Sequence, residues 1–232
     1  MNLDDFKKAV ASYGLDLDED RLQKLLTYAS LLKEWNEKMN LTSIVEKEEV
    51  FEKHFLDSLT STLVYDFKDK KVADIGSGAG FPGMVIALFF PTSHVTLIDA
   101  TKKKFLFLEE AKKALDLQNV SFHVGRVEDM KKERETFDCV ISRGFAAMNI
   151  FLEVATPLVK MNGIVLAMKG PKGEEELHAS LNAEQKLSLH LRKKETTLLP
   201  DGATRMNFTF EKTRHTPERF PRPWAEIQKK PL

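Results

Sequence analysis

The sequence predicts an α/β fold with a mostly parallel sheet, and three features predict it. Five short runs of β-branched and apolar residues occur between residues 71 and 168. Helix-length segments separate these runs, an alternation typical of βαβ units whose parallel strands are buried on both faces. Two further strand candidates near the C-terminus are joined by Pro200-Asp201-Gly202, which indicates an antiparallel hairpin.

The first third of the chain predicts helices. Over residues 20–37, apolar side chains recur at three- and four-residue steps, after the acidic segment 18–20 that suits a helix N-terminus. A second helical pattern covers residues 46–59. We expect residues 1–68 to form a helical cap whose apolar face packs on the rest of the protein.

The central domain is expected over residues 69–211. Its five parallel strands are predicted at 72–75, 95–98, 120–124, 137–141 and 163–168. The helices are predicted near 82–90, 101–115 and 145–158, and a polar helical stretch over 174–190 precedes the hairpin strands 195–199 and 206–210. Seven strands in this order are the inventory of a Rossmann-like methyltransferase sheet rather than of a dehydrogenase half.

Composition and charge exclude several classes of protein. A hydrophobic content of 42% with 30% charged residues is ordinary for a soluble globule, and no apolar run approaches the roughly 20 residues of a membrane span. The single cysteine, Cys139, excludes a disulfide framework, and the acidic N-terminus lacks a secretory signal, so we expect a cytoplasmic protein. Equal numbers of basic and acidic side chains, 35 of each, argue against nucleic-acid binding over the whole surface.

A glycine-rich turn follows the first parallel strand, in the run 74–83. Glycines allow a sharp turn and a close approach of ligand to backbone, at the sheet edge where open α/β folds bind small molecules. Gly78, Gly80 and Gly83 fit the spacing of a dinucleotide-binding motif, and Asp99 lies about 20 residues further on. An NAD(P)-linked oxidoreductase therefore stays open as an alternative.

The carboxylate before this turn favours a different cofactor. Asp74 lies two residues before the first glycine, where it would repel a pyrophosphate but attract the amino group of a methionine moiety. We therefore predict S-adenosylmethionine as the cofactor. Asp99, at the end of the second strand, is expected to accept hydrogen bonds from the ribose hydroxyls, with capping of the next helix as the alternative.

Motifs spread over nearly the whole chain closely resemble the RsmG (GidB) family of bacterial 16S ribosomal RNA guanine-N(7) methyltransferases. The motifs are residues 40–44, 54–59, 74–83, 142–146 and 216–222. The resemblance implies a class I methyltransferase fold and transfer of a methyl group to nitrogen 7 of a guanosine in the decoding region of 16S rRNA. Two departures from the family pattern are Gly144, where Ala or Val is common, and a tail without Gly-x-Pro after Pro221-Arg222.

Position and resemblance together predict the site residues. Arg143, just past the fourth strand, is the predicted catalytic residue, because a guanidinium can hold the cofactor carboxylate or the guanine edge in a bidentate fork. A salt bridge to the sheet rim is the alternative. The predicted cofactor contacts are Asp74, Gly76, Gly78, Gly80, Phe81, Asp99, Val127, Glu128 and Arg143. The predicted substrate contacts are Asn40, His54, Asp57, Lys169, Arg219 and Arg222.

The chemistry fits the residues that are present. Nitrogen 7 of guanine carries an exposed lone pair, so it needs no general base, and the enzyme mainly aligns the reactants. Cys139 lies mid-strand among apolar residues and is interpreted as buried and inert. Because no His/Cys cluster has metal-ligand spacing, we predict no metal. A ribosome-binding module without catalytic activity is the non-enzymatic alternative.

The tail, residues 212–232, is the expected RNA-binding element. It carries six basic against two acidic side chains, with His215, Phe220 and Trp224 interleaved. Basic side chains neutralise phosphates and aromatic rings stack on unpaired bases, so we expect contacts with 16S rRNA or the 30S subunit by a monomer. A solvated tail fixed by its prolines is the alternative. The run Lys102–Lys104 is interpreted as a solvated helix face, or as an RNA-facing rim.

Overall fold

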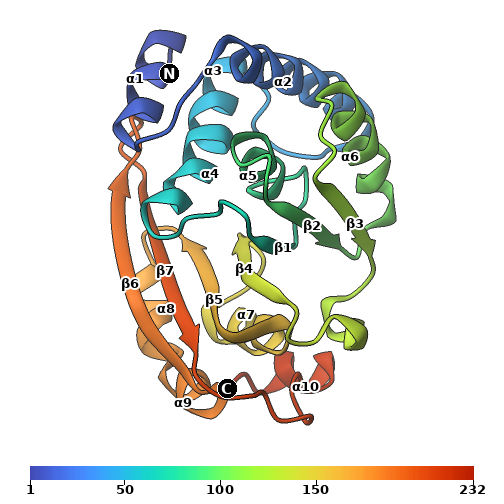
Figure 1. The fold of residues 1–232 in the computed structure, drawn as a ribbon, viewed down its shortest axis with the longest axis vertical. Helices are drawn as coiled ribbons and strands as arrows, with labels where there is room; N and C mark the ends of the chain where they lie inside the picture. Colours follow the sequence, from blue (N-terminus) through green and yellow to red (C-terminus); the bar gives the residue numbers. More distant parts are fainter.

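The computed structural model describes residues 1–232 and contains one seven-stranded sheet between two helical layers (Figure 1). The strand order is β3-β2-β1-β4-β5-β7-β6. The strands are β1 Lys71–Ile75, β2 His94–Asp99, β3 Val120–Val124, β4 Phe137–Arg143, β5 Val159–Lys169, β6 Leu189–Leu198 and β7 Thr204–Lys212. Strands β1 to β5 are parallel and β7 is antiparallel to both neighbours, so the predicted sheet is confirmed.

The N-terminal helical extension is also confirmed. Its helices are α1 Leu3–Ser12, α2 Glu19–Met39, α3 Lys47–Val50 and α4 Asp57–Leu59, with a π-helical segment Phe51–Leu56 that joins the last two. Asp18 caps α2 by accepting a hydrogen bond from the Arg21 amide. The predicted helix over 46–59 is therefore one continuous helical segment, whereas α1 was not predicted.

The two faces of the sheet bury different helices, because successive side chains of a strand point to opposite sides. Val72 joins the apolar cluster of α1, α2, α5 Gly83–Phe89 and α6 Lys102–Ala114. Ala73 joins the cluster formed by α7 Met148–Ala155, α9 Leu181–Leu187 and α10 Trp224–Lys229. Cys139 lies in the first cluster and is fully buried, as expected, and burial raises the pKa of its thiol.

Strand β6 begins six residues earlier than predicted. The stretch predicted as one polar helix over 174–190 consists of α8 Gly173–Ala179 and α9, and β6 already starts at Leu189. This strand forms the edge of the sheet and most of its side chains are exposed. Its first six residues include the polar or basic His190, Arg192, Lys193 and Lys194. Charged side chains protect an edge strand against pairing with another chain, but they hide the strand from a search for apolar runs.

The tail is folded onto the helical layer that contains α7. Phe220, Ile227 and Leu232 are buried in the cluster that contains α7. Lys212, at the end of β7, is fully buried, and its Nζ donates to Glu135 Oε1 (2.7 Å) and to the Val159 carbonyl (2.7 Å). The expectation that Lys212 neutralises RNA phosphates is therefore wrong, since this ammonium group is satisfied inside the protein.

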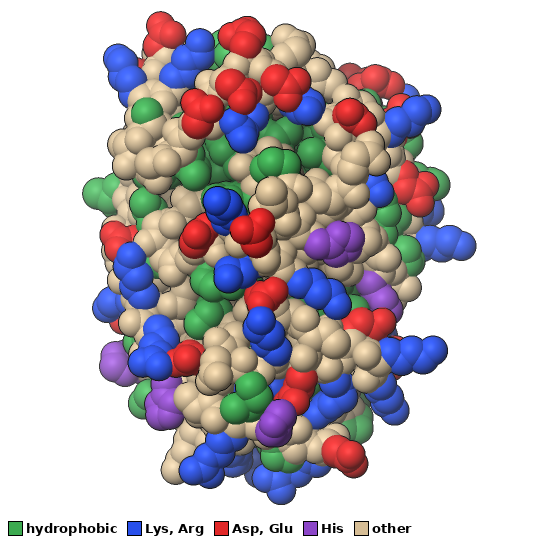
Figure 2. Space-filling model, in the orientation of Figure 1, with side chains coloured by type: hydrophobic (Ala, Val, Ile, Leu, Met, Phe, Trp, Pro, Cys, Tyr) green, Lys and Arg blue, Asp and Glu red, His purple; other side chains and the backbone are tan.

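Charge is distributed unevenly over the surface. Figure 2 shows acidic side chains over the N-terminal helices and more lysines and arginines toward the opposite end of the molecule. None of the helices combines the length and the apolar character that crossing a bilayer requires.

Candidate active site at the carboxyl edge of the sheet

Two adjoining cavities open where the parallel strands end, the edge at which open α/β sheets bind ligands. The first has a volume of about 400 Å³ and is lined by residues that follow β1, β2, β3 and β4. The second, of about 680 Å³, lies between β4, β5 and the N-terminal helical segment. Gly144 and Phe145 line both cavities, so the two spaces share one wall.

Four of the predicted cofactor residues line the first cavity, namely Gly76, Asp99, Val127 and Glu128. Val127 and Glu128 begin a short 3₁₀ turn after β3. Gly76 has a left-handed φ of 72°, and a Cβ added to it would lie 2.8 Å from Phe145 Cδ2. A side chain at this position would therefore meet the shared wall, which explains why glycine suits it.

Asp99 is the charged centre of the first cavity. Its Oδ2 accepts hydrogen bonds from the Gly78 amide (3.1 Å) and Lys104 Nζ (2.9 Å), and its Oδ1 accepts one from the Thr101 amide (2.8 Å). Burial would raise the pKa of Asp99, but the hydrogen bonds from Lys104 and Thr101 outweigh it and lower the pKa. The carboxylate thus stays ionised at the cavity wall and also ties the glycine turn to α6.

Lys104 is a residue of the site that sequence reasoning missed. It belongs to the run interpreted as a solvated helix face, yet it lines the first cavity and pairs with Asp99. The available signal was its position in the first turn of α6, directly after the acidic strand end.

Asp74 is placed differently from the expectation. Its side chain is fully buried behind the glycine turn and does not line the cavity. Oδ2 accepts a hydrogen bond from the Gly83 amide (2.8 Å) at the start of α5, and Oδ1 has no partner. Burial raises the pKa of Asp74 to about 7, although the Gly83 amide opposes the shift. In this structure Asp74 therefore fixes the turn from behind, and its predicted contact with the cofactor stays a prediction.

Gly80 and Phe81 of the turn contact the N-terminal helices instead of the first cavity. A Cβ on Gly80 (φ 92°) would lie 2.4 Å from Tyr28 Oη, and this hydroxyl donates to the Ala79 carbonyl at 2.5 Å. The Phe81 ring stacks on His54, with 4.4 Å between centroids. Helix α2 and the π-helical segment thus hold the glycine turn in place.

Arg143 joins the end of β4 to the N-terminal helical segment. Its Nη1 donates to Asp57 Oδ2 (2.8 Å) and to the Lys53 carbonyl (2.9 Å), and its Nη2 donates to His54 Nδ1 (3.0 Å). Asp57 is only 2% exposed, and its Oδ1 accepts from Arg205 Nε at 3.0 Å. The structure therefore brings together three predicted residues, Arg143, His54 and Asp57, on the wall of the second cavity.

The hydrogen bonds of His54 fix its protonation. A guanidinium only donates, so Nδ1 is the acceptor and Nε2–H donates to Thr42 Oγ1 at 3.0 Å. Burial, together with the charge of Arg143, lowers the pKa of His54 to about 3. The ring is therefore neutral near pH 7, and both of its nitrogens are in use.

The remaining predicted substrate residues have mixed positions. Lys169 lines the second cavity, pairs with Glu176 Oε2 (2.7 Å) and donates to the Ala146 carbonyl (2.6 Å). Asn40 lines neither cavity, and it ends α2 in a left-handed conformation, which asparagine tolerates.

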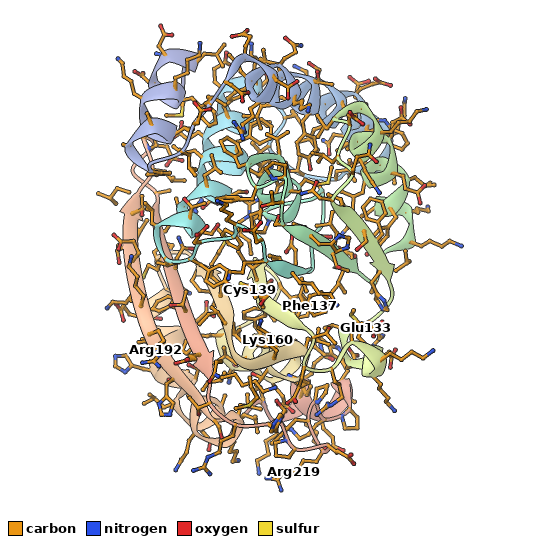
Figure 3. All side chains as sticks on the ribbon, viewed as in Figure 1. Glu133, Phe137, Cys139, Lys160, Arg192 and Arg219 are labelled. Atoms are coloured by element: carbon orange, nitrogen blue, oxygen red, sulfur yellow. The ribbon has the colours of Figure 1, made fainter.

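The two tail arginines lie outside both cavities. Arg222 pairs with the fully buried Glu153, donating from Nε to Oε1 (2.8 Å) and from Nη2 to Oε2 (2.7 Å). Arg219 is exposed near the end of the molecule, where Figure 3 shows its side chain pointing outward. The tail residue that lines the first cavity is instead Trp224, which sequence reasoning had assigned to RNA.

The structure holds no group of three or more His, Cys, Asp or Glu side chains arranged to bind a metal ion.

Comparison with known proteins identifies relatives along the whole chain. The family model GidB, described as rRNA small subunit methyltransferase G, matches residues 21–201. Ribosomal RNA small subunit methyltransferase G of Bacillus subtilis (strain 168) is 38% identical over 237 residues, covering 100% of this chain and 99% of the relative. Its counterpart in Clostridium perfringens (strain 13 / Type A) is 43% identical over 233 residues, covering 97% of each chain.

Solved structures agree on the fold. The crystal structure of M. jannaschii TYW2 in complex with AdoMet superimposes with a TM-score of 0.53 at 19% identity, over 64% of this chain and 71% of that one. Together with the sheet order, this likeness confirms the predicted Rossmann-like class I methyltransferase fold. The extent of the family match and the full-length identities show that the chain belongs to the GidB family, rRNA small subunit methyltransferase G.

Proposed function

We propose that this protein transfers a methyl group from S-adenosylmethionine to nitrogen 7 of a guanosine in the decoding region of 16S rRNA. The observation that carries the proposal is the pair of adjoining cavities, one containing Asp99 and the other containing Arg143, with Gly144 and Phe145 between them. Such an arrangement suits a small cofactor beside a larger space for a base. The names of the relatives support ribosomal RNA as the substrate.

The first cavity fits the adenosyl group of the methyl donor. Its volume of about 400 Å³ falls within the range of about 300–1,000 Å³ that is usual for small-molecule sites. Asp99 accepts three hydrogen bonds, and a carboxylate has about four acceptor positions, so capacity remains for a ribose hydroxyl. Val127 and Glu128 supply an apolar wall and a polar group for the adenine. When bound, S-adenosylmethionine supplies a methyl group on a positively charged sulfur.

The second cavity suits a nucleophile that loses no proton. Both nitrogens of His54 and both oxygens of Asp57 are engaged. Glu176 Oε2 is shared by Lys169 Nζ and the Met148 amide, each at a distance near 2.8 Å. His54, the neutral base beside Arg143, therefore has no free nitrogen to accept a proton. This supports a guanine ring nitrogen as the acceptor, because its lone pair attacks without deprotonation.

Arg143 is proposed to orient the guanine. A guanidinium has five N–H donors, and three of them serve Asp57, Lys53 and His54. The two that remain are available for the acceptor edge of the base. Since direct transfer depends on alignment of the nucleophile with the methyl group, a guanidinium held by three fixed partners is a suitable anchor.

The basic tail has a narrower proposed role than the sequence indicated. Arg214, Arg219, Lys229 and Lys230 are exposed and remain available to RNA phosphates. We also propose that the protein acts as a cytoplasmic monomer without a metal ion.

Mass mapping of methylated nucleotides in 16S rRNA, from cells with and without the gene, tests this function. We expect one 7-methylguanosine in the decoding region to disappear when the gene is deleted and to return when it is restored. An unchanged methylation map, or loss of a methyl group from a different atom or nucleotide, would contradict the proposal. Parallel reactions of the purified protein with naked 16S rRNA and with 30S subunits show which form is the substrate.

A further inference from the structure

Two aromatic rings from distant segments meet at the wall of the first cavity. Phe145 follows β4, and Trp224 is the first residue of α10. Their ring centroids are 6.1 Å apart with an angle of 50° between the planes. Both residues line the cavity and both are only half-buried, so each leaves aromatic surface uncovered.

The C-terminal segment holds Trp224 in a fixed position. The residue two places before it, Arg222, forms the two-bond ion pair with Glu153 of α7, and Arg222 Nη2 also donates to the Lys230 carbonyl at 3.1 Å. Ile227 of α10 is fully buried. At the end of the chain, Asn149 of α7 donates to the Leu232 carbonyl at 3.2 Å. Helix α10 is thereby fastened to α7 on both sides of the indole.

The segment reaches the first cavity from the side of Val127 and Glu128. These two residues also line a neighbouring cavity of about 300 Å³, together with Phe220 and Pro221 of the C-terminal segment. Trp224 lines the first cavity with Val127 and Glu128, the two residues expected to meet the purine of the cofactor. A flat aromatic ring with an uncovered face is suited to stacking on a purine.

We propose that Trp224, supported by Phe145, forms an aromatic wall for the adenine ring of the methyl donor, so that the C-terminal segment is part of the cofactor site. This inference rests on the proposed function. It replaces RNA stacking as the role of this indole, and it makes Arg222 a positioning residue that acts through Trp224.

The chain allows a direct optical test, because its only two tryptophans are Trp35 and Trp224. Trp35 lies on α2 beside Phe107 and lines neither cavity. In a Trp35→Phe protein, Trp224 is the sole indole. We expect its emission to change saturably on titration with S-adenosylhomocysteine, whereas a Trp224→Phe protein, which retains Trp35, shows no change.

Calorimetric titration with S-adenosylhomocysteine measures the contribution of the ring. Stacking of one base on an aromatic side chain supports a loss of roughly tenfold in affinity for Trp224→Ala. We expect Trp224→Phe to restore most of the affinity and the matched control Trp35→Phe to bind like the unsubstituted protein. Circular dichroism checks that the alanine variant is folded. If the alanine variant is not folded, the fluorescence titration of Trp35→Phe still tests the proposal, because that variant leaves residue 224 unchanged.

Three outcomes would overturn the proposal. An unchanged emission of Trp224 at saturating ligand would show that the indole does not contact it. A Trp224→Ala protein that binds S-adenosylhomocysteine normally but binds 30S subunits weakly would show that the indole contacts RNA and not the cofactor. Failure of the unsubstituted protein to bind S-adenosylhomocysteine would refute the proposed function itself, and this inference with it.

Discussion

Substitution of Arg143 by alanine separates the stabilising role of this residue from its role in catalysis. The change removes three hydrogen bonds, to Asp57, the Lys53 carbonyl and His54. Asp57 keeps its pair with Arg205, so no buried charge is left without a partner. Three weakened or unpaired polar groups at about 1 kcal/mol each give a loss of about 3 kcal/mol in the free energy of unfolding.

The expected effect on methyl transfer is of comparable size. Loss of a positioning group at the reacting centre reduces turnover about 100-fold, which corresponds to about 2.7 kcal/mol. Tritiated methyl transfer to 30S subunits measures turnover, and urea unfolding measures stability and the folded fraction. Because the guanidinium orients the base, we expect kcat to fall more than KM rises. Arg143→Lys keeps the charge but loses the fork, so it should recover only part of the activity.

Lys212→Met is the matched control for stability. It also removes a buried cation from an ion pair, with Glu135, but Lys212 lines neither cavity. We expect a similar loss of stability with turnover per folded molecule within a few-fold of the unsubstituted protein. The assignment of Arg143 fails if Arg143→Ala turns over as fast as the unsubstituted protein, or if both variants lose activity in proportion to their stability.

Two further predictions concern the backbone and pH. Gly80→Ala combines a left-handed φ with a contact of 2.4 Å to Tyr28 Oη, whereas Gly202→Ala combines a similar φ with open space. Urea unfolding should show that the free energy of unfolding falls by about 1 kcal/mol for Gly202→Ala and by at least twice that for Gly80→Ala. Equal losses would show that Tyr28 does not restrict the side chain at position 80. His54 has a folded pKa of about 3, below its ordinary value of 6.5, so below pH 6.5 the unfolded chain binds a proton that the native state does not. Stability linked to His54 is thus present above pH 6.5 and is lost as the pH falls toward 3, by at most about 1.4 kcal/mol per pH unit. Burial raises the pKa of Asp74 to about 7, so the contribution of Asp74 to stability changes with pH in the opposite direction. The measurement is therefore the difference in the free energy of unfolding between the unsubstituted protein and His54→Gln at pH 7, 6 and 5. Parallel curves would contradict the His54 prediction.

Local pattern was enough to predict the parallel sheet, the N-terminal helices that follow α1, and the position of Asp99 at a strand end. Each depends on residues close together in sequence: the apolar strand runs, the three- and four-residue steps of α2, and an acid at a strand end. The basic half of β6 was missed because an edge strand needs no apolar face. The helix α1 was missed as well, although it buries Phe6 and Val10.

Long-range pairing accounts for the other differences. The local sequence suggested that Lys212 and Arg222 are free cations of the tail. In the structure each forms an ion pair with a glutamate more than 65 residues away. A burial of this kind requires the tertiary fold to bring both partners together, and no local spacing encodes it. The orientation of Asp74 toward Gly83 and the arrival of Trp224 at the first cavity were unpredictable for the same reason.

Arg143, His54 and Asp57 show an intermediate case. The motifs around each residue pointed to the site separately, but their direct contact joins positions 86 and 89 residues apart in the chain. Sequence resemblance therefore singled out these residues one by one, and the structure joins them in one hydrogen-bonded cluster.

The most direct test of the account is a calorimetric comparison of S-adenosylhomocysteine with NAD on the unsubstituted protein and on Asp99→Asn. The cavity around Asp99 is predicted to bind S-adenosylhomocysteine at one site per chain, to bind it at least tenfold more weakly in the variant, and to bind NAD in neither. Saturable binding of NAD without binding of S-adenosylhomocysteine would contradict the central claim that this cavity holds a methyl donor.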